Sequence, residues 1–182
     1  MTTATSQEIA RYNLDPVHST VEFIVRHLMI SKVRGRFVSF QGSFELAPGS
    51  DVPQAISASI DAASIDTREA QRDAHLKSAD FFEVEKYPTL EFVSTRVEGA
   101  ADAFKVFGNL TMHGVTKDVV LEGTFEGRGA DPWGGQRAAY AAHVTVNRKD
   151  FGLHWNAALE TGGVVISDEV RIELNVEGVL QK

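Results

Sequence analysis

The stretch that decides the fold is Val170-Arg171-Ile172-Glu173-Leu174-Asn175-Val176-Glu177, in which every second residue is apolar. Because successive side chains of a strand point to opposite faces, this alternation predicts a β-strand with one apolar and one polar face. The same alternation recurs upstream, and further strands are expected between its occurrences. Together they give about eight strands: 21–27, 35–46, 54–63, 89–98, 104–110, 119–125, 140–147 and 170–176.

Only one segment has a helical character. Asp66 or Thr67 is expected to cap a helix over Arg68–Leu76, and a second short turn is expected at Ser78–Phe82. Eight strands with one apolar face each, and almost no helix to cover them, must close into a barrel or stack as a sandwich. The pattern alone leaves both open. A closed barrel removes unpaired edges, and at eight strands its interior holds either side chains or one slender ligand.

Composition narrows the classes of function. The 182 residues suit one domain, and the net charge of −7, with Lys and Arg scattered along the chain, argues against nucleic acid as a partner. No apolar run approaches the ~20 residues of a transmembrane helix. Cysteine is absent, which excludes disulfides and thiolate chemistry. Residues 1–11 have neither the basic nor the apolar region of a signal peptide. We therefore expect an N-terminal tail (1–11), a single domain (12–182) and a cytoplasmic location.

Several ordered motifs carry a family resemblance. They are Asp15-Pro-Val-His-Ser19, Gly35-Arg-Phe37, Arg72-Asp-Ala-His-Leu76, Gly108-Asn-Leu-Thr-Met-His-Gly-Val-Thr-Lys117 and Asn147-Arg-Lys-Asp-Phe-Gly-Leu-His-Trp155. With them the chain resembles the YceI family of polyisoprenoid-binding proteins from about Tyr12 to Val179. The resemblance implies an all-β, eight-stranded antiparallel lipocalin-like barrel with one short helical segment at its mouth. Many members are exported, and from residues 1–11 we expect this chain to differ from them in having no signal sequence.

The resemblance also implies what the barrel holds. Members look like carriers or stores of isoprenoid quinones, polyprenyl phosphates or fatty-acid derivatives. Periodicity alone favours a solid core; the resemblance favours a lumen that binds a long apolar lipid, with no other cofactor and no catalysis. The sequence does not decide whether the chain forms a homodimer. The predicted lumen residues are Phe23, Val25, His27, Phe37, Phe40, Phe44, Phe92, Phe104, Val106, Leu121, Phe125, Tyr140, Ala142, Val144, Ile172 and Leu174.

Three residues are candidates for contacting the polar head of such a lipid. Arg72 and His75 lie on the helix that the resemblance places at the mouth, and Arg148 belongs to the Asn147–Trp155 motif. For Arg148, a structural ion pair with Asp150 or Asp168 is the better interpretation, because residues two apart on a strand share one face.

Two other kinds of protein remain as alternatives. The first is an enzyme acting on a small apolar substrate, with His27 and an acidic partner as acid and base. Nucleophilic catalysis has little support, because the chain has no G-x-S-x-G motif and no cysteine. The second is an interaction module with a solid barrel that acts through its loops. The six histidines form no HxH or HExxH pair, so no metal site is predicted.

Overall fold

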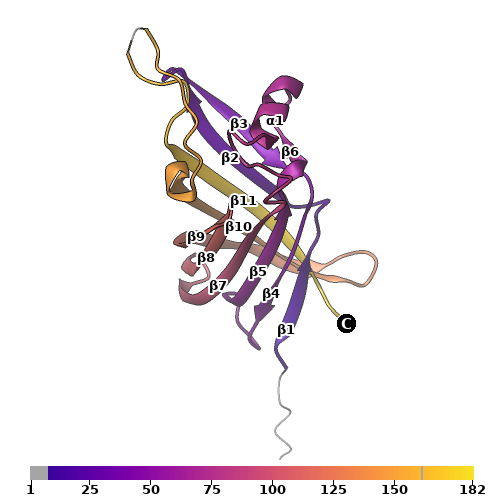
Figure 1. The fold of residues 1–182 in the computed structure, drawn as a ribbon. Coiled ribbons are helices and arrows are strands. Elements are labelled where there is room, and N and C mark those ends of the chain that lie inside the picture. The colour runs from indigo at the N-terminus through magenta and orange to yellow at the C-terminus, as the bar shows by residue number, and fades with distance from the viewer. Residues whose placement is uncertain (1–7, 161) are drawn as a thin grey trace, which may run out of the picture.

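The computed structural model describes residues 8–160 and 162–182, which fold almost entirely into one curved sheet (Figure 1). None of the helices in these ranges is long and apolar enough to cross a membrane. The elements, in chain order, are β1 (Ala10–Leu14), β2 (Thr20–His27), β3 (Ser31–Phe37), β4 (Phe40–Leu46), β5 (Pro53–Asp61), η1 (Ala62–Ser64), β6 (Ile65–Asp66), α1 (Ala70–Lys77), β7 (Thr89–Ala100), β8 (Ala103–Met112), β9 (Val115–Ala130), β10 (Gln136–Asn147), η2 (Arg148–Phe151) and β11 (Glu169–Leu180).

The sheet closes because β1 pairs with two neighbours at once. It pairs with β4 through Tyr12 opposite Phe44, and with β11 through Leu14 opposite Gly178. The ring therefore runs β1, β4, β5, β7, β8, β9, β10, β11 and back to β1, with every pair antiparallel. Within the described part of the chain this is an eight-stranded antiparallel barrel, which confirms the predicted fold and excludes the sandwich.

Three strands of the ring are interrupted, and the sequence pattern did not predict this. β2 continues β1 along β11, β3 precedes β4, and β6 continues β5. The predicted strand 35–46 is accordingly divided at Val38 and Ser39. β1 begins at Ala10, two residues before the boundary expected at Tyr12. The part of the predicted tail at 1–7 lies outside the described residues.

The first interruption shows how the barrel tolerates these breaks. Asp15 to His18 leave the sheet between β1 and β2. At the return point the hydroxyl of Ser19 accepts a hydrogen bond from the backbone N–H of Glu177 at 3.0 Å. This side chain replaces one backbone partner, so the ladder with β11 is not left unsatisfied. The excursion places Asp15 and His18 on the outside of the barrel.

The helix begins later than predicted. α1 starts at Ala70 because Arg68 has a left-handed backbone (φ +64°), which cannot continue into a helix. The N-cap is Glu69, whose carboxylate accepts hydrogen bonds from the N–H groups of Gln71 and Arg72. The predicted cap Thr67 instead donates to Asp73 through both its N–H and its hydroxyl. These bonds fix α1 against the end of the barrel, where Figure 1 shows it beside β2 and β3.

A cavity with one closed end

The inside of the barrel is hollow. A cavity of about 540 Å³ runs within the ring and has almost entirely apolar walls. A solid packed core, the alternative that periodicity favoured, is therefore wrong. Of the sixteen predicted lumen residues, all except Phe125 line this cavity, and so do Arg72, His75 and Arg148.

Phe125 is the one misplaced lumen prediction. Alternation put it on the same face as Leu121, and the β9–β10 register agrees, because Phe125 is opposite Tyr140, which lines the cavity. The register shift lies beyond this pair, between Tyr140 and Ala139. The Phe125 ring packs against the Tyr140 ring, with 5.5 Å between centroids, and of the two only Tyr140 lines the cavity.

Aromatic rings close the end of the barrel opposite α1. Tyr140 is at the centre: its ring makes edge contacts with Phe44 at 5.1 Å and Phe104 at 5.9 Å between centroids. Tyr12 stacks on Phe44 at 5.1 Å. All four of these residues are buried. The Tyr140 hydroxyl donates to the carbonyl of Asp51 at 2.8 Å, and burial raises the pKa of Tyr140. The cavity is therefore blind at this end.

The opposite end is the mouth. Arg26, Gln71 and Arg72 line the cavity here and are also exposed to solvent. The Arg72 guanidinium is held in place, since its Nε and Nη2 both donate to Thr67 at 2.8 Å. Arg72 is thus a fixed positive charge at the entrance.

His75 also lies at the mouth, in an aromatic setting. Its ring makes edge contacts with Trp155 at 4.7 Å and with Phe81 at 5.0 Å between centroids. Its Nε2 lies 2.7 Å from a carboxylate oxygen of Asp80. Trp155 and Phe81 line the cavity as well, and neither was among the lumen residues predicted from the sequence. They belong to irregular segments, where no alternation indicates which side chains point inward.

Arg148 has a structural role in the fold. The sequence pattern placed it on a strand, whereas it lies in the short helix η2. Its guanidinium donates to the carbonyls of Ser167 (3.0 Å), Leu153 (2.7 Å) and Trp155 (2.8 Å). Asp168 lies 3.7 Å from Nη2, so the ion pair with Asp168 is present. Burial lowers the pKa of Arg148. These contacts clamp the segment between η2 and β11 over the mouth.

His27 faces the cavity, as predicted, but has none of the partners that an acid–base site needs. Within residues 8–160 and 162–182, no hydrogen bond or ion pair joins its ring to a carboxylate. The geometry that the enzyme alternative requires at His27 is therefore not present in this part of the chain.

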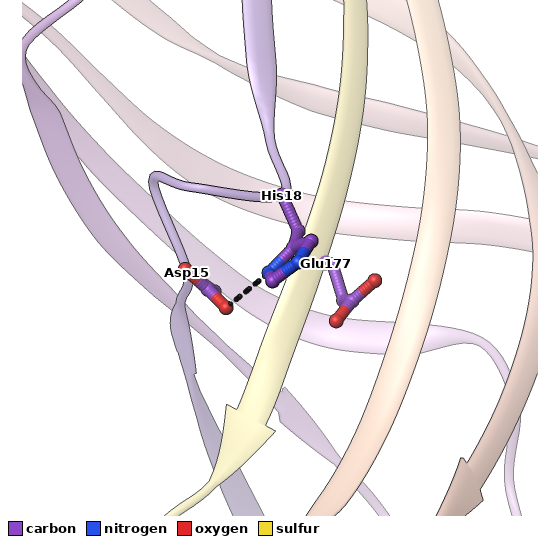
Figure 2. A group of neighbouring side chains, drawn as sticks. All are labelled: Asp15, His18 and Glu177. Atoms are coloured by element: carbon purple, nitrogen blue, oxygen red, sulfur yellow. Dashed lines mark hydrogen bonds and ion pairs between the residues drawn. The ribbon is translucent and has the colours of Figure 1, made fainter. Parts of the chain in front are cut away.

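One group of three side chains within the described residues has the spacing to hold a metal ion: Asp15, His18 and Glu177 (Figure 2). The guanidinium of Arg137 already bridges the two carboxylates, at 2.8 Å from Asp15 and 2.7 Å from Glu177. Hydrogen bonds with the His18 ring and with Arg137 hold the pKa of Asp15 at about 2, below its usual value. A metal ion would have to displace Arg137, so we interpret this group as an ion-pair network.

Comparisons with known proteins agree with this architecture. A family model described as the YceI-like domain matches residues 12–178. A UPF0312 protein of Yersinia enterocolitica is 40% identical over 184 residues, which cover 100% of this chain and 93% of the relative.

Two solved structures are also similar. The crystal structure of Campylobacter jejuni YceI protein has a TM-score of 0.76 at 28% identity, covering 86% of this chain and 90% of that one. The structure of a polyisoprenoid binding domain from Saccharophagus degradans has a TM-score of 0.65 at 19% identity, covering 93% and 98%. At that identity the second likeness supports the fold alone.

Proposed function

This chain belongs to the YceI-like domain family, as its motifs predicted, and we propose that it binds one long apolar lipid inside the barrel without transforming it. The ligand class is an isoprenoid quinone, a polyprenyl phosphate or a fatty-acid derivative. The tail lies along the cavity and the polar end stays at the mouth. A domain of the same fold from Saccharophagus degradans is named as polyisoprenoid binding, so a barrel of this fold can hold a ligand of this class. Storage or transport of the lipid is the role that such binding serves.

The main support for lipid binding is the hollow apolar interior of the barrel. Apolar walls around a space of about 540 Å³ lack packing partners when no ligand is bound, and such a gap costs stability. Apolar tails restore the missing contacts and gain about 0.8 kcal/mol for each CH₂ group removed from water. The volume also falls within the ~300–1,000 Å³ of known ligand sites.

The shape of the cavity favours a ligand that is polar at one end only. Among the described aromatic residues that line the closed end, Tyr140 alone carries a hydroxyl, and this hydroxyl already donates to the carbonyl of Asp51. At the mouth, by contrast, Arg72 presents a guanidinium fixed by two bonds to Thr67, and His75 lies beside it on α1. A carbonyl or phosphate head placed there can accept a hydrogen bond from Arg72.

The test is uptake by protein that has been stripped of lipid by unfolding in denaturant and then refolded. Polyprenyl phosphate, an isoprenoid quinone and a long-chain fatty acid are added from ethanol solution, unbound lipid is removed, and the protein is extracted with organic solvent. We expect one lipid per barrel for at least one of the three, and none for the matching short-chain compounds. Absence of all three from the extract would contradict the proposal.

A further inference from the structure

The turn between β2 and β3 presents three consecutive apolar side chains to solvent. Leu28, Met29 and Ile30 are 37%, 51% and 81% exposed. Single exposed apolar residues are common, but a run of three at a hairpin tip lowers solubility and is retained where it contacts something.

The backbone of this tip makes the choice of residues more unusual. Leu28 and Met29 both have left-handed conformations, with φ of +53° and +62°. Hairpin turns with two positive φ angles favour Asn-Gly, because bulky side chains are strained there. Polar turn residues would therefore suit both the backbone and the solvent better. The tip carries Leu and Met against both preferences, which indicates a function for their side chains.

Positive charge lies directly behind the apolar tip. Arg26 and Lys32 are opposite each other in the β2–β3 register, and both are exposed. Neither forms an ion pair with another residue in the described ranges. The next cation along the hairpin, Arg34, is already paired with Glu22 and Glu173, at 3.1 Å each. The neighbouring loop adds one exposed carboxylate, Glu160. In a chain of net charge −7, the tip therefore stands out as basic.

The tip adjoins the mouth of the cavity. The N–H of Leu28 donates to the carbonyl of Val165 at 2.8 Å, and Met29 packs over Gly163, so the hairpin and the loop before β11 support each other. His27 and Val165, which flank this contact, both line the cavity. Figure 1 shows the hairpin and the loop projecting together beyond the rest of the barrel.

We propose that this hairpin tip docks the protein on the surface of an anionic lipid bilayer. The side chains of Leu28, Met29 and Ile30 enter the headgroup region, and Arg26 and Lys32 contact lipid phosphates. In this orientation the mouth faces the membrane, and a lipid tail passes between bilayer and cavity with little exposure to water. That loading role rests on the proposed function, whereas docking itself does not.

The test is co-sedimentation with vesicles of phosphatidylcholine, with and without phosphatidylglycerol. The tip variant is Leu28→Asn with Met29→Gly and Ile30→Thr, which installs the favoured turn residues and so preserves the hairpin. The matched control is Val17→Ser with Trp133→Ser, which removes two side chains that are each 84% exposed elsewhere on the barrel. A third variant, Arg26→Gln with Lys32→Gln, removes the charges. Uptake of lipid from ethanol solution is measured on every variant, without vesicles.

We expect wild-type protein and the control to sediment with anionic vesicles, and the tip variant to stay in solution while keeping its uptake. The charge variant should bind about fivefold more weakly for each basic residue removed, and high salt should have the same effect. The docking proposal would be overturned if wild-type protein did not sediment with anionic vesicles. It would also be overturned if the control variant lost as much vesicle binding as the tip variant. Tip-dependent docking without any uptake would support docking and contradict the proposed lipid-binding function.

Discussion

The outer end of the Phe23 ring lies over Gly35, its partner residue on the neighbouring strand. A Cβ atom at position 35 would be only 2.2 Å from Phe23 Cζ. Phe104 and Gly123 form a second cross-strand pair of this kind, with 2.4 Å between a Cβ and the nearest ring atom. By leaving room against the wall of the barrel, the glycines let large rings lie along it and leave the centre of the lumen open.

Gly35→Ala should therefore push the Phe23 ring into the cavity. The clash involves the far end of a side chain that can rotate, so we expect a loss of lipid uptake with little change in the melting temperature. Combining Gly35→Ala with Phe23→Leu should restore uptake, because the smaller side chain frees the space. Gly129→Ala is the control, since nothing lies within 4 Å of a Cβ there. Unchanged uptake in the single variant would show that the tail does not pass Phe23.

Ala142 lies between Tyr140 and Val144 on the inner face of β10 and lines the cavity. In a packed core Ala142→Trp would cost about 1–3 kcal/mol or more. In this hollow barrel the indole can occupy space that the ligand uses. We expect near-native melting of the lipid-free protein and much weaker uptake. Ala141→Trp, on the outer face, should leave uptake unchanged. An unfolded Ala142→Trp variant, or full binding by it, would contradict a ligand path at this position.

Trp155 gives an internal reporter of binding. The chain has two tryptophans, of which Trp155 lines the mouth and Trp133 is 84% exposed. Trp133→Phe leaves Trp155 as the only indole. We expect an isoprenoid quinone to quench its fluorescence in a saturable way, with one equivalent at the end point. Quenching that stays linear with quinone concentration would indicate collisions in solution and no binding at the mouth.

The Asp15 network should make stability depend on acid. Asp15 has a pKa of about 2 in the folded protein against 3.8 in the unfolded chain, so its ionised form stabilises the fold above about pH 4. This contribution is lost as the pH falls from about 4 to about 2. Asp15→Asn should be less stable than wild-type protein at neutral pH and should lose less stability across that interval. Urea unfolding at a series of pH values measures both.

The control for this measurement is Asp102→Asn in the turn between β7 and β8, a carboxylate outside every ion pair in the described residues. Its acid dependence should follow that of wild-type protein. If Asp15→Asn shows the wild-type acid dependence as well, the network around Arg137 does not contribute to stability in solution.

Regular strands explain why most of the lumen was predictable. Where alternation is unbroken, as in β8 and β11, one face of the strand must meet the interior, and Val106, Ile172 and Leu174 do so. Phe125 shares the inner face with its partner Tyr140 but packs against the Tyr140 ring and does not line the cavity, because alternation does not indicate how far along that face the hollow extends. The resemblance, and not the periodicity, indicated a hollow barrel, because the two faces of a strand look the same whether the interior is full or empty.

The mouth was harder to predict. Many of its residues come from α1, from the turn after α1 and from the segment after η2, where contacts between distant parts of the chain decide the conformation. Arg148 shows this: its partners Leu153, Trp155 and Ser167 offer backbone carbonyls, which have no residue-type signature. The turn at Leu28 and Met29 was also not predicted, because the sequence pattern gives no reason to expect positive φ at bulky apolar residues.

Whether the barrel holds one long apolar lipid is tested most directly by native mass spectrometry of freshly purified protein, followed by organic extraction of anything that is bound. We expect a species heavier than the polypeptide by the mass of one lipid, which is lost on unfolding and recovered in the extract as a long-chain isoprenoid or acyl compound. Ala142→Trp, purified in the same way, should carry much less of it. A spectrum with only the polypeptide mass, from protein that also takes up no prenyl or acyl lipid afterwards, would contradict the account.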